Sequence, residues 1–187
     1  MEINLDIILE NDRLKLRPIE LMDIEKLSRY TGNPAMWRFF THDLSDPLEF
    51  RAWLDPAFNQ KRLQFAIIDK TKQELIGTTA FGNLSMKDKR IEIGWTWLGK
   101  EFQGIGINGQ VKQLMITYAF EKLGMERVEF KTDVLNAQSR SALKNIGAIE
   151  EGVLRNHTVM TKGRRRDTIY FSILSSEWNH VKRENDW

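Results

Sequence analysis

A chain of 187 residues, with 41% apolar and 29% charged residues, has the length and composition of one globular domain with a substantial core. Its 28 basic and 26 acidic side chains give a formal charge of +2, so the composition carries no general signal for a nucleic-acid partner. The absence of cysteine excludes disulfides and a thiol nucleophile, and the three histidines lack metal-ligand spacing. We therefore expect no metal. We also expect a cytoplasmic protein, because no stretch has the apolar length of a membrane span or the pattern of a signal peptide.

The first half of the chain predicts antiparallel hairpins and two helices. Alternating apolar residues predict half-buried strands, and apolar residues three and four apart predict amphipathic helices. The expected elements are a strand at 13–17, a helix at 20–30, a helix that begins after Asp46 and Pro47, and strands at 63–68, 75–81 and 91–98. Strict alternation in the last strand predicts two faces, one with Ile91, Ile93, Trp95 and Trp97 and the other with Glu92, Gly94 and Thr96.

The second half predicts a strand–helix–strand unit followed by further strands. Its expected elements are a glycine-rich run at 103–109, a long amphipathic helix ending at Gly124, a strand at 127–134, a helix at 138–146, strands at 149–160 and 167–174, and a short helix within 175–187. Strands and helices are interleaved without a linker or repeat, so we expect one α/β domain over residues 1–187.

The glycine-rich run is the most informative segment. Glycines at 104, 106 and 109 leave backbone N–H groups uncovered where a helix begins, and the positive end of the helix dipole adds to their attraction for an anion such as a pyrophosphate. The run also fits the dinucleotide fingerprint, with Asp133 as a ribose-binding acid. Against that alternative, five residues separate the strand from Gly104, and too little chain follows for a second nucleotide-binding half. A simple helix-entry turn is the third possibility.

Gln103-x-x-Gly106, opening a helix after a strand that contains Glu92, resembles the coenzyme A loop of the GNAT superfamily of N-acetyltransferases. The segments 92–98, 119–124, 136–143 and 147–155 are similar to its branch of ribosomal-protein N-terminal (RimJ/RimL-like) acetyltransferases. The resemblance implies a GNAT-type mixed, mostly antiparallel sheet of about seven strands, with helices on both faces and a divergence between the fourth and fifth strands. The cofactor-binding half would be about 75–175.

The co-substrate implied by the resemblance is acetyl-CoA, with its pantetheine arm between the two diverging strands. The implied contacts are Trp97, Leu98, Gln103, Gly104, Ile105, Gly106, Ile107, Asn108, Asn136 and Ser139. The backbone N–H groups of 103–108 would hold the diphosphate, and Asn136 would hydrogen-bond the arm. Asn108 departs from the family pattern, which usually has glycine or alanine there.

Glu92 and Ser139 are the implied catalytic residues. An amine must be neutral to attack a thioester, and at pH 7 only roughly 0.04% of a lysine-like amine and roughly 10% of an N-terminal amine is neutral. Glu92 is therefore the candidate base, directly or through water, with a salt-bridged strand glutamate as the alternative. The tyrosine that many members use for the leaving thiol is missing between Asn136 and Gly147. Ser139 would take that place, unless it only stabilises its helix end.

Several features allow more than one interpretation. The cluster Arg164–Arg166 could attract an acidic substrate or the phosphate groups of rRNA, although a solvated turn is the simpler interpretation. The aromatic residues Trp37, Phe39 and Phe40 could line the acceptor pocket or belong to the core. We expect His157 to be structural. The acceptor is a protein N-terminus or a small amine, and a homodimer is possible. The remaining rivals are an NAD-dependent oxidoreductase and a non-catalytic acyl-CoA-binding regulator.

Overall fold

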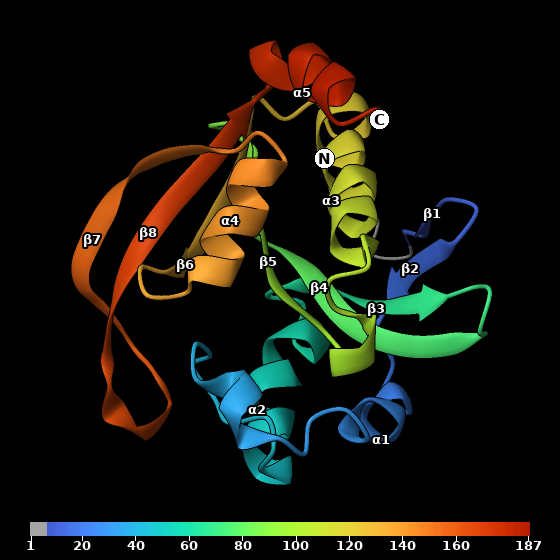
Figure 1. Ribbon diagram of the computed structural model, residues 1–187, viewed down its shortest axis with the longest axis vertical. Helices are drawn as coiled ribbons and strands as arrows, with labels where there is room; N and C mark the ends of the chain where they lie inside the picture. Colours follow the sequence, from blue (N-terminus) through green and yellow to red (C-terminus); the bar gives the residue numbers. More distant parts are fainter. Residues whose placement is uncertain (1–6) are drawn as a thin grey trace.

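The structure is a computed structural model and describes residues 7–187 (Figure 1). Within them, eight strands form one sheet: β1 Leu9–Glu10, β2 Leu14–Pro18, β3 Leu63–Asp69, β4 Glu74–Ser85, β5 Arg90–Leu98, β6 Arg127–Asp133, β7 Ile149–Val159 and β8 Arg165–Leu174. The helices are α1 Asp23–Ser28, α2 Pro47–Phe58, α3 Ile107–Thr117, α4 Ala137–Asn145 and α5 Trp178–Glu184, and a π-helical turn, Tyr118–Lys122, extends α3. Short 3₁₀ turns lie at Pro34–Trp37, Lys100–Phe102, Thr161–Gly163 and Ser175–Glu177.

The strand order in the sheet is β1-β2-β3-β4-β5-β6-β8-β7. Every pairing in the described part is antiparallel except that of β5 with β6, which is parallel. The predicted mixed, mostly antiparallel sheet is confirmed, with one strand more than expected because the short β1 pairs with β2. The additional strand also shifts the count, so the predicted divergence falls between β5 and β6.

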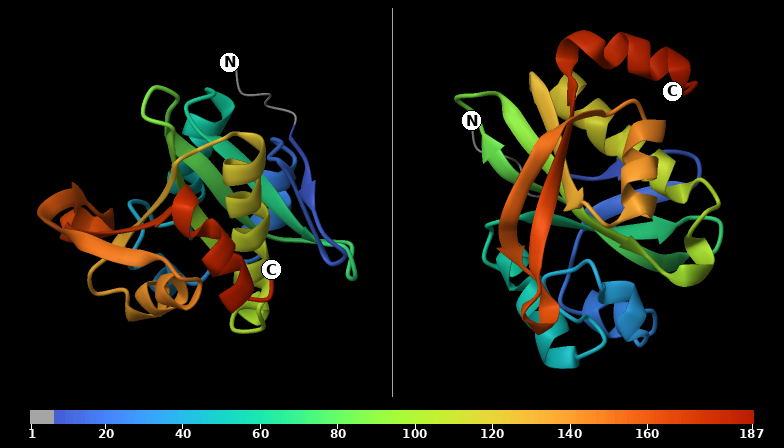
Figure 2. Two further views of the ribbon diagram at one scale, coloured as in Figure 1. Left: turned by 90° about the horizontal axis from the view of Figure 1, so that it is seen from above. Right: turned by 60° about the vertical axis from the view of Figure 1, so that its left-hand side comes forward.

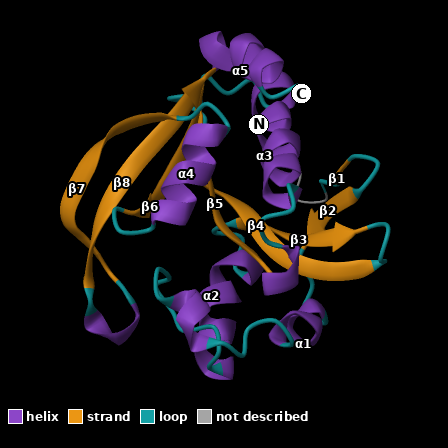
Figure 3. Ribbon diagram, viewed as in Figure 1, coloured by secondary structure: helices purple, strands orange, loops and turns teal. Residues whose placement is uncertain are grey.

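The helices cover both faces of the sheet, as predicted. Figures 1 and 3 show α1 and α2 on one side and α3 and α4 on the other, and the right-hand view in Figure 2 shows α5 at one end of the sheet. The larger core cluster joins α3, α4 and α5 to the sheet, and a second cluster lies between the sheet and α2. Burial of these side chains stabilises the fold by roughly 1.5–3 kcal/mol each.

The start of α2 confirms its sequence signal. The Asp46 carboxylate accepts hydrogen bonds from the N–H groups of Leu48 and Glu49, at 2.8 and 3.0 Å. Pro47 occupies the first helical position, where its missing N–H costs nothing. The predicted apolar face is buried. This helix end is therefore satisfied by the chain itself.

A β-bulge in β5 reverses the alternation of its side chains. Thr78 pairs with Trp97 and Ala80 with Gly94, so β5 has one more residue than β4 in this interval. Trp95, inside the bulge, has a φ of 50°. As a result Ile91 and Ile93 face the α3 side, whereas Trp95 and Trp97 face α2, and the prediction that all four share a face was wrong.

Candidate functional site

The strands β5 and β6 pair only at their first residues. Their register covers three positions and ends where Glu92 lies opposite Glu129. Beyond that point β5 continues to Leu98 and β6 to Asp133, but the two strands no longer pair with each other, and Figure 1 shows them separating. The backbone groups of β5 that would face β6 are thus left without a strand partner. An extended chain with amide groups can bind there.

The start of α3 lies beside this divergence and carries no cap. Gly106 is the residue before the helix, with a φ of 83°, and no side chain accepts a hydrogen bond from the first turn. The first backbone bond runs from the Gln110 N–H to the Gly106 carbonyl, at 3.3 Å. The N–H groups of Ile107, Asn108 and Gly109 therefore have no acceptor within the helix.

The loop before α3 leaves this helix end open. Gly104, like Gly106, has a left-handed backbone with a φ of 74°, and a Cβ atom built on either glycine would meet nothing within 4 Å. Gln103 fixes the loop to the end of β5, because its side-chain amide donates to the Leu98 carbonyl at 2.9 Å. Ile105 is exposed, whereas Ile107 is buried in the core. The arrangement fits an anionic group at the helix N-terminus.

Asn108, the departure from the family pattern, sits in the first turn of α3. Its side-chain oxygen is buried and has no hydrogen-bond partner among residues 7–187. A buried acceptor of this kind normally binds a donor from the protein, from water or from a ligand. The pantetheine arm carries such donors in its amide and hydroxyl groups, so this asparagine is compatible with coenzyme A.

The start of α4 contributes two predicted residues. The Asn136 side-chain oxygen caps the helix by accepting from the Ser139 N–H at 3.1 Å. Within the described residues, no partner contacts the Asn136 amide nitrogen or the Ser139 hydroxyl. In Figure 1, α3 and α4 lie on the same face and begin at the same end of that layer. Ser139 lies in the first turn of α4, but the side chain that caps this helix end is that of Asn136, and the Ser139 hydroxyl remains available.

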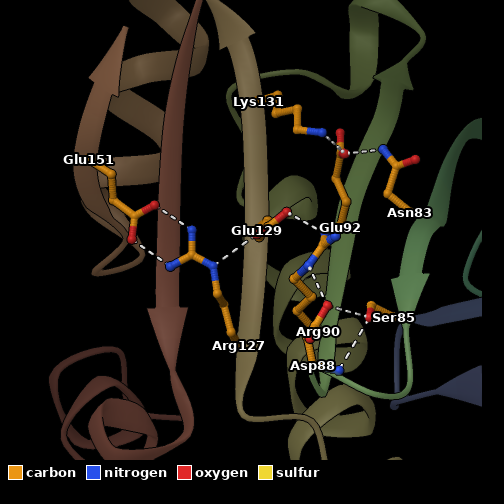
Figure 4. A network of polar contacts seen from close by, with 9 residues as sticks. All are labelled: Asn83, Ser85, Asp88, Arg90, Glu92, Arg127, Glu129, Lys131 and Glu151. Atoms are coloured by element: carbon orange, nitrogen blue, oxygen red, sulfur yellow. Dashed lines mark hydrogen bonds and ion pairs between the residues drawn. The ribbon is translucent and has the colours of Figure 1, made fainter. Parts of the chain in front are cut away.

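Glu92 is buried, with 5% of its surface exposed, at the point where β5 and β6 part. Its Oε2 atom accepts from the Asn83 amide at 2.6 Å and lies 2.7 Å from the Lys131 Nζ atom (Figure 4). Burial tends to lower the pKa of Lys131, but its contacts with Glu92 and Tyr170 outweigh burial and raise it. The salt-bridge interpretation of Glu92 is thus correct in part.

The other carboxylate oxygen of Glu92, Oε1, has no partner within residues 7–187. It lies toward Gly94, since a Cβ atom on that glycine would be 3.4 Å from it. The absence of a side chain at Gly94 leaves this oxygen open in the direction of the bulge. Glu92 can therefore be held by one oxygen and use the other as a proton acceptor.

A charged network that sequence reasoning missed holds the base of the divergence together (Figure 4). Arg127 on β6 binds Glu151 of β7 and lies 2.9 Å from Glu129, and Arg90 of β5 lies 3.4 Å from the same glutamate. Hydrogen bonding to Glu151 raises the pKa of Arg127 despite its partial burial. These contacts join β5, β6 and β7 where the strands begin to separate.

Lys112 is a further residue that the sequence analysis missed. It lies within the apolar stripe of α3, between the buried residues Val111 and Met115, and only 5% of its surface is exposed. Its Nζ atom donates to the Thr96 hydroxyl at 2.8 Å. A lysine at a core position of an amphipathic helix was the signal that could have identified it.

The basic cluster Arg164–Arg166 is folded into local contacts. Arg164 binds the buried carboxylate of Asp133, and Arg165 donates to the Asn156 side chain at 2.9 Å. Arg166 donates to Thr168 at 2.9 Å, and burial lowers its pKa. Asp133 is thus engaged by the protein and is not a free ribose-binding acid.

The aromatic cluster and His157 are largely structural. Trp37 is buried and packs against Trp97, with ring centroids 5.4 Å apart. Phe39 and Phe40 are half-buried. The His157 ring contacts the Thr168 hydroxyl at 3.0 Å, as expected for a structural histidine.

The comparisons agree with this geometry. A family model described as the acetyltransferase (GNAT) domain matches residues 13–149. The "Putative ribosomal N-acetyltransferase YdaF" of Bacillus subtilis (strain 168) is 31% identical over 92% of this chain and 97% of its own length. The "Uncharacterized N-acetyltransferase p20" of Bacillus licheniformis is 32% identical over 91% of this chain and 97% of its own length. A crystal structure of a GCN5-related N-acetyltransferase from Brucella melitensis superposes with a TM-score of 0.89 at 28% identity, covering 97% of this chain and 84% of that one.

The fold and the diverging strands define an N-acetyltransferase. The chain belongs to the GNAT acetyltransferase family, in its RimJ/RimL-like branch. This membership excludes the dinucleotide-binding alternative. Among residues 7–187 no helix has the length and apolarity to cross a membrane, and no three His, Asp or Glu side chains are grouped to hold a metal ion.

Proposed function

We propose that the protein transfers the acetyl group of acetyl-CoA to a primary amine by direct attack within a ternary complex. The observation that supports this most strongly is the short parallel pairing of β5 with β6 beside the uncapped start of α3. The two features offer unpaired backbone to a pantetheine arm and free N–H groups to a diphosphate. A cofactor with both parts fits both features at once.

Coenzyme A would be held mainly by the backbone. The N–H groups of 103–108 would bind the diphosphate, and the unpaired edge of β5 near Trp97 and Leu98 would pair with the amides of the arm. The Asn136 amide nitrogen, which the helix cap leaves free, would hydrogen-bond the arm from the α4 side. Asn108 would accept one of its donors.

The chemistry requires a neutral amine and a polarised thioester. The free Glu92 oxygen would accept a proton from the attacking amine, directly or through water, and such general base catalysis contributes about 10²- to 10⁴-fold. A backbone N–H in the bulge near Trp97 would bind the acyl oxygen as negative charge develops on it. The Ser139 hydroxyl would hydrogen-bond the sulfur.

The acceptor would approach from the α2 face, where Glu92 lies. On this face the Trp97 indole N–H and both polar side-chain atoms of Gln64 are buried without a partner in the described chain. These groups could bind the amides of a peptide or the polar groups of a small amine. The printed name of the Bacillus subtilis relative favours a ribosomal protein, and such an acceptor would place the enzyme in the cytoplasm.

The test is a panel of N-terminal peptides and small amines, scored by release of coenzyme A with a thiol reagent. Because the protein has no cysteine, the only thiol in the assay is that of coenzyme A. We expect acceptor-dependent release with at least one amine class. Tight binding of acetyl-CoA with no release across the panel would instead support the regulator alternative.

A further inference from the structure

The Lys112 side chain reaches from α3 to the place where β5 and β6 part. Its Nζ atom lies 2.8 Å from the Thr96 hydroxyl, on β5, and 5.9 Å from the centroid of the Phe130 ring, on β6. Phe130 directly follows Glu129, the last paired residue of β6. The ammonium group therefore contacts both strands in the stretch where they are no longer paired with each other.

This ammonium group is buried without a counter-ion. No carboxylate within residues 7–187 lies within ion-pairing distance of Lys112, and burial lowers its pKa from 10.5 to about 7. The charged residues nearest in sequence to its contacts, Glu92, Glu129 and Lys131, alternate to the opposite face of the sheet and bind one another or Arg90 and Arg127.

The other elements around Lys112 also leave its charge uncompensated. On β4, Thr79 is neutral and bonds the Thr96 hydroxyl at 2.8 Å. On α4, Arg140 donates to the Val134 carbonyl at 3.1 Å and lies near Glu150. In the π-helical turn that follows α3, burial raises the pKa of Tyr118. None of these groups supplies an anion that could pair with the Lys112 ammonium group.

Two of the three ammonium donors of Lys112 have no acceptor among the described residues. Its one partner, the Thr96 hydroxyl, also contacts Thr79 and the Gly94 carbonyl. A buried cation with open donors binds an anion more strongly than a solvated one does, because water does not compete. The unpaired stretch of β5 and β6 is where such an anion can arrive.

We propose that Lys112 binds the thiolate of coenzyme A as it leaves and gives it a proton. This role rests on the proposed function. The amine nitrogen forms a bond to the acetyl carbon, the carbon–sulfur bond breaks, and its electron pair stays on sulfur. The proton on Lys112 Nζ moves to that sulfur, the proton lost by the amine passes to Glu92, and both groups then exchange with solvent.

The acidity of the two groups suits this transfer. A thiol has an ordinary pKa of about 8.5, close to the value of about 7 that burial gives Lys112, and the ammonium group beside the sulfur lowers the thiol pKa further. The two groups therefore share one proton, which Lys112 can pass to the sulfur while a substantial fraction of thiolate persists. A serine hydroxyl is a far weaker acid. In this scheme Ser139 orients the sulfur and Lys112 supplies the proton.

The test measures the thiol of bound coenzyme A, separately from turnover. The ultraviolet absorbance of the thiolate is recorded against pH in the coenzyme A complex, with the desulfo-coenzyme A complex as the blank. We expect at least about tenfold more thiolate at neutral pH in the wild-type complex than in the Lys112→Met complex. Lys122→Met, which removes an exposed lysine just beyond the same helix, should match the wild type.

The outcomes separate this role from the proposed function. Equal thiolate fractions in wild type and Lys112→Met, with both proteins binding coenzyme A, would overturn the role of Lys112 and leave the acetyltransferase proposal intact. A wild-type protein that binds no coenzyme A would overturn both. If Lys112→Met does not fold, Lys112→Gln keeps a donor toward Thr96 and is measured instead.

Discussion

The start of α2 and the start of α3 solve the same physical problem in opposite ways. Both helices begin with N–H groups that need acceptors. At α2, Asp46 supplies a carboxylate, whereas at α3 the corresponding residue is Gly106, which has no side chain to offer. The first end is complete without a ligand and the second is not. We therefore propose the uncapped helix end beside the unpaired strands as the place where the ligand binds.

The strongest way to break this contrast is to give α3 a cap of its own. In Gly106→Asp a carboxylate would occupy the place of the diphosphate and repel it, so the affinity for coenzyme A should fall at least about 100-fold. The left-handed backbone should cost only about 1–2 kcal/mol of stability. Titration calorimetry measures the affinity.

Gly163→Asp is the matched control for that variant, because Gly163 has a similar φ of 75° in a turn far along the chain. It should carry a similar stability cost and bind coenzyme A as the wild type does. Equal loss of affinity in both variants would mean that backbone strain, and not the added charge, causes the effect.

The Glu92→Gln variant separates the binding of acetyl-CoA from the transfer of its acetyl group. It removes a proton acceptor and keeps the size of the side chain, so turnover should fall at least about tenfold while the affinity for acetyl-CoA stays nearly constant. Melting temperatures control for the loss of the Lys131 ion pair. Unchanged turnover across the pH range would remove Glu92 from its proposed role.

Lys112 makes a prediction for stability that is independent of any ligand. The folded protein loses the Lys112 proton near pH 7, whereas the unfolded chain keeps it to about 10.5, so raising the pH through this window stabilises the wild type. Below pH 7 the full burial cost applies, at most about 5 kcal/mol. Lys112→Met should therefore be more stable near pH 7, with the advantage shrinking toward pH 10.

Urea unfolding of both proteins at several pH values measures that difference. A constant difference from pH 7 to pH 10 would show that Lys112 keeps an ordinary pKa in the folded state. Such a result would also weaken its proposed role as an acid.

The residues at the start of α4 should have smaller effects. Asn136→Ala removes a helix cap worth about 1 kcal/mol and one proposed contact to the arm, so stability and coenzyme A affinity should both fall modestly.

Ser139→Ala should lower turnover a few-fold, whereas the control Ser141→Ala, which changes an exposed serine two residues further along α4, should leave turnover unchanged. Equal kinetics in the two serine variants would assign Ser139 to the helix alone.

Sequence reasoning predicted most of the fold because the signals were local. The cap at Asp46, the glycine run before α3 and the stop at Gly124 all depend on a few neighbouring residues. The faces of β5 could not be predicted, because the bulge at Trp95 depends on pairing with β4. β1 was missed because two residues carry no periodicity.

The candidate site divides in the same way. The sequence identified Glu92 through its place in a strand, but its partners Asn83 and Lys131 come from two other strands that only the fold brings together. Lys112 looked like an ordinary helix residue, because its environment depends on where α3 lies over β5 and β6. The sequence predicted the backbone loop of the site, but it did not predict which charged side chains are buried there.

A crystal structure of the acetyl-CoA complex tests the central claim most directly. We predict diphosphate oxygens within hydrogen-bond distance of the N–H groups of 104–108, and the pantetheine arm between β5 and β6 with its thioester near Trp97. A cofactor bound at another surface, or strands β5 and β6 paired along their whole length in the complex, would contradict the account.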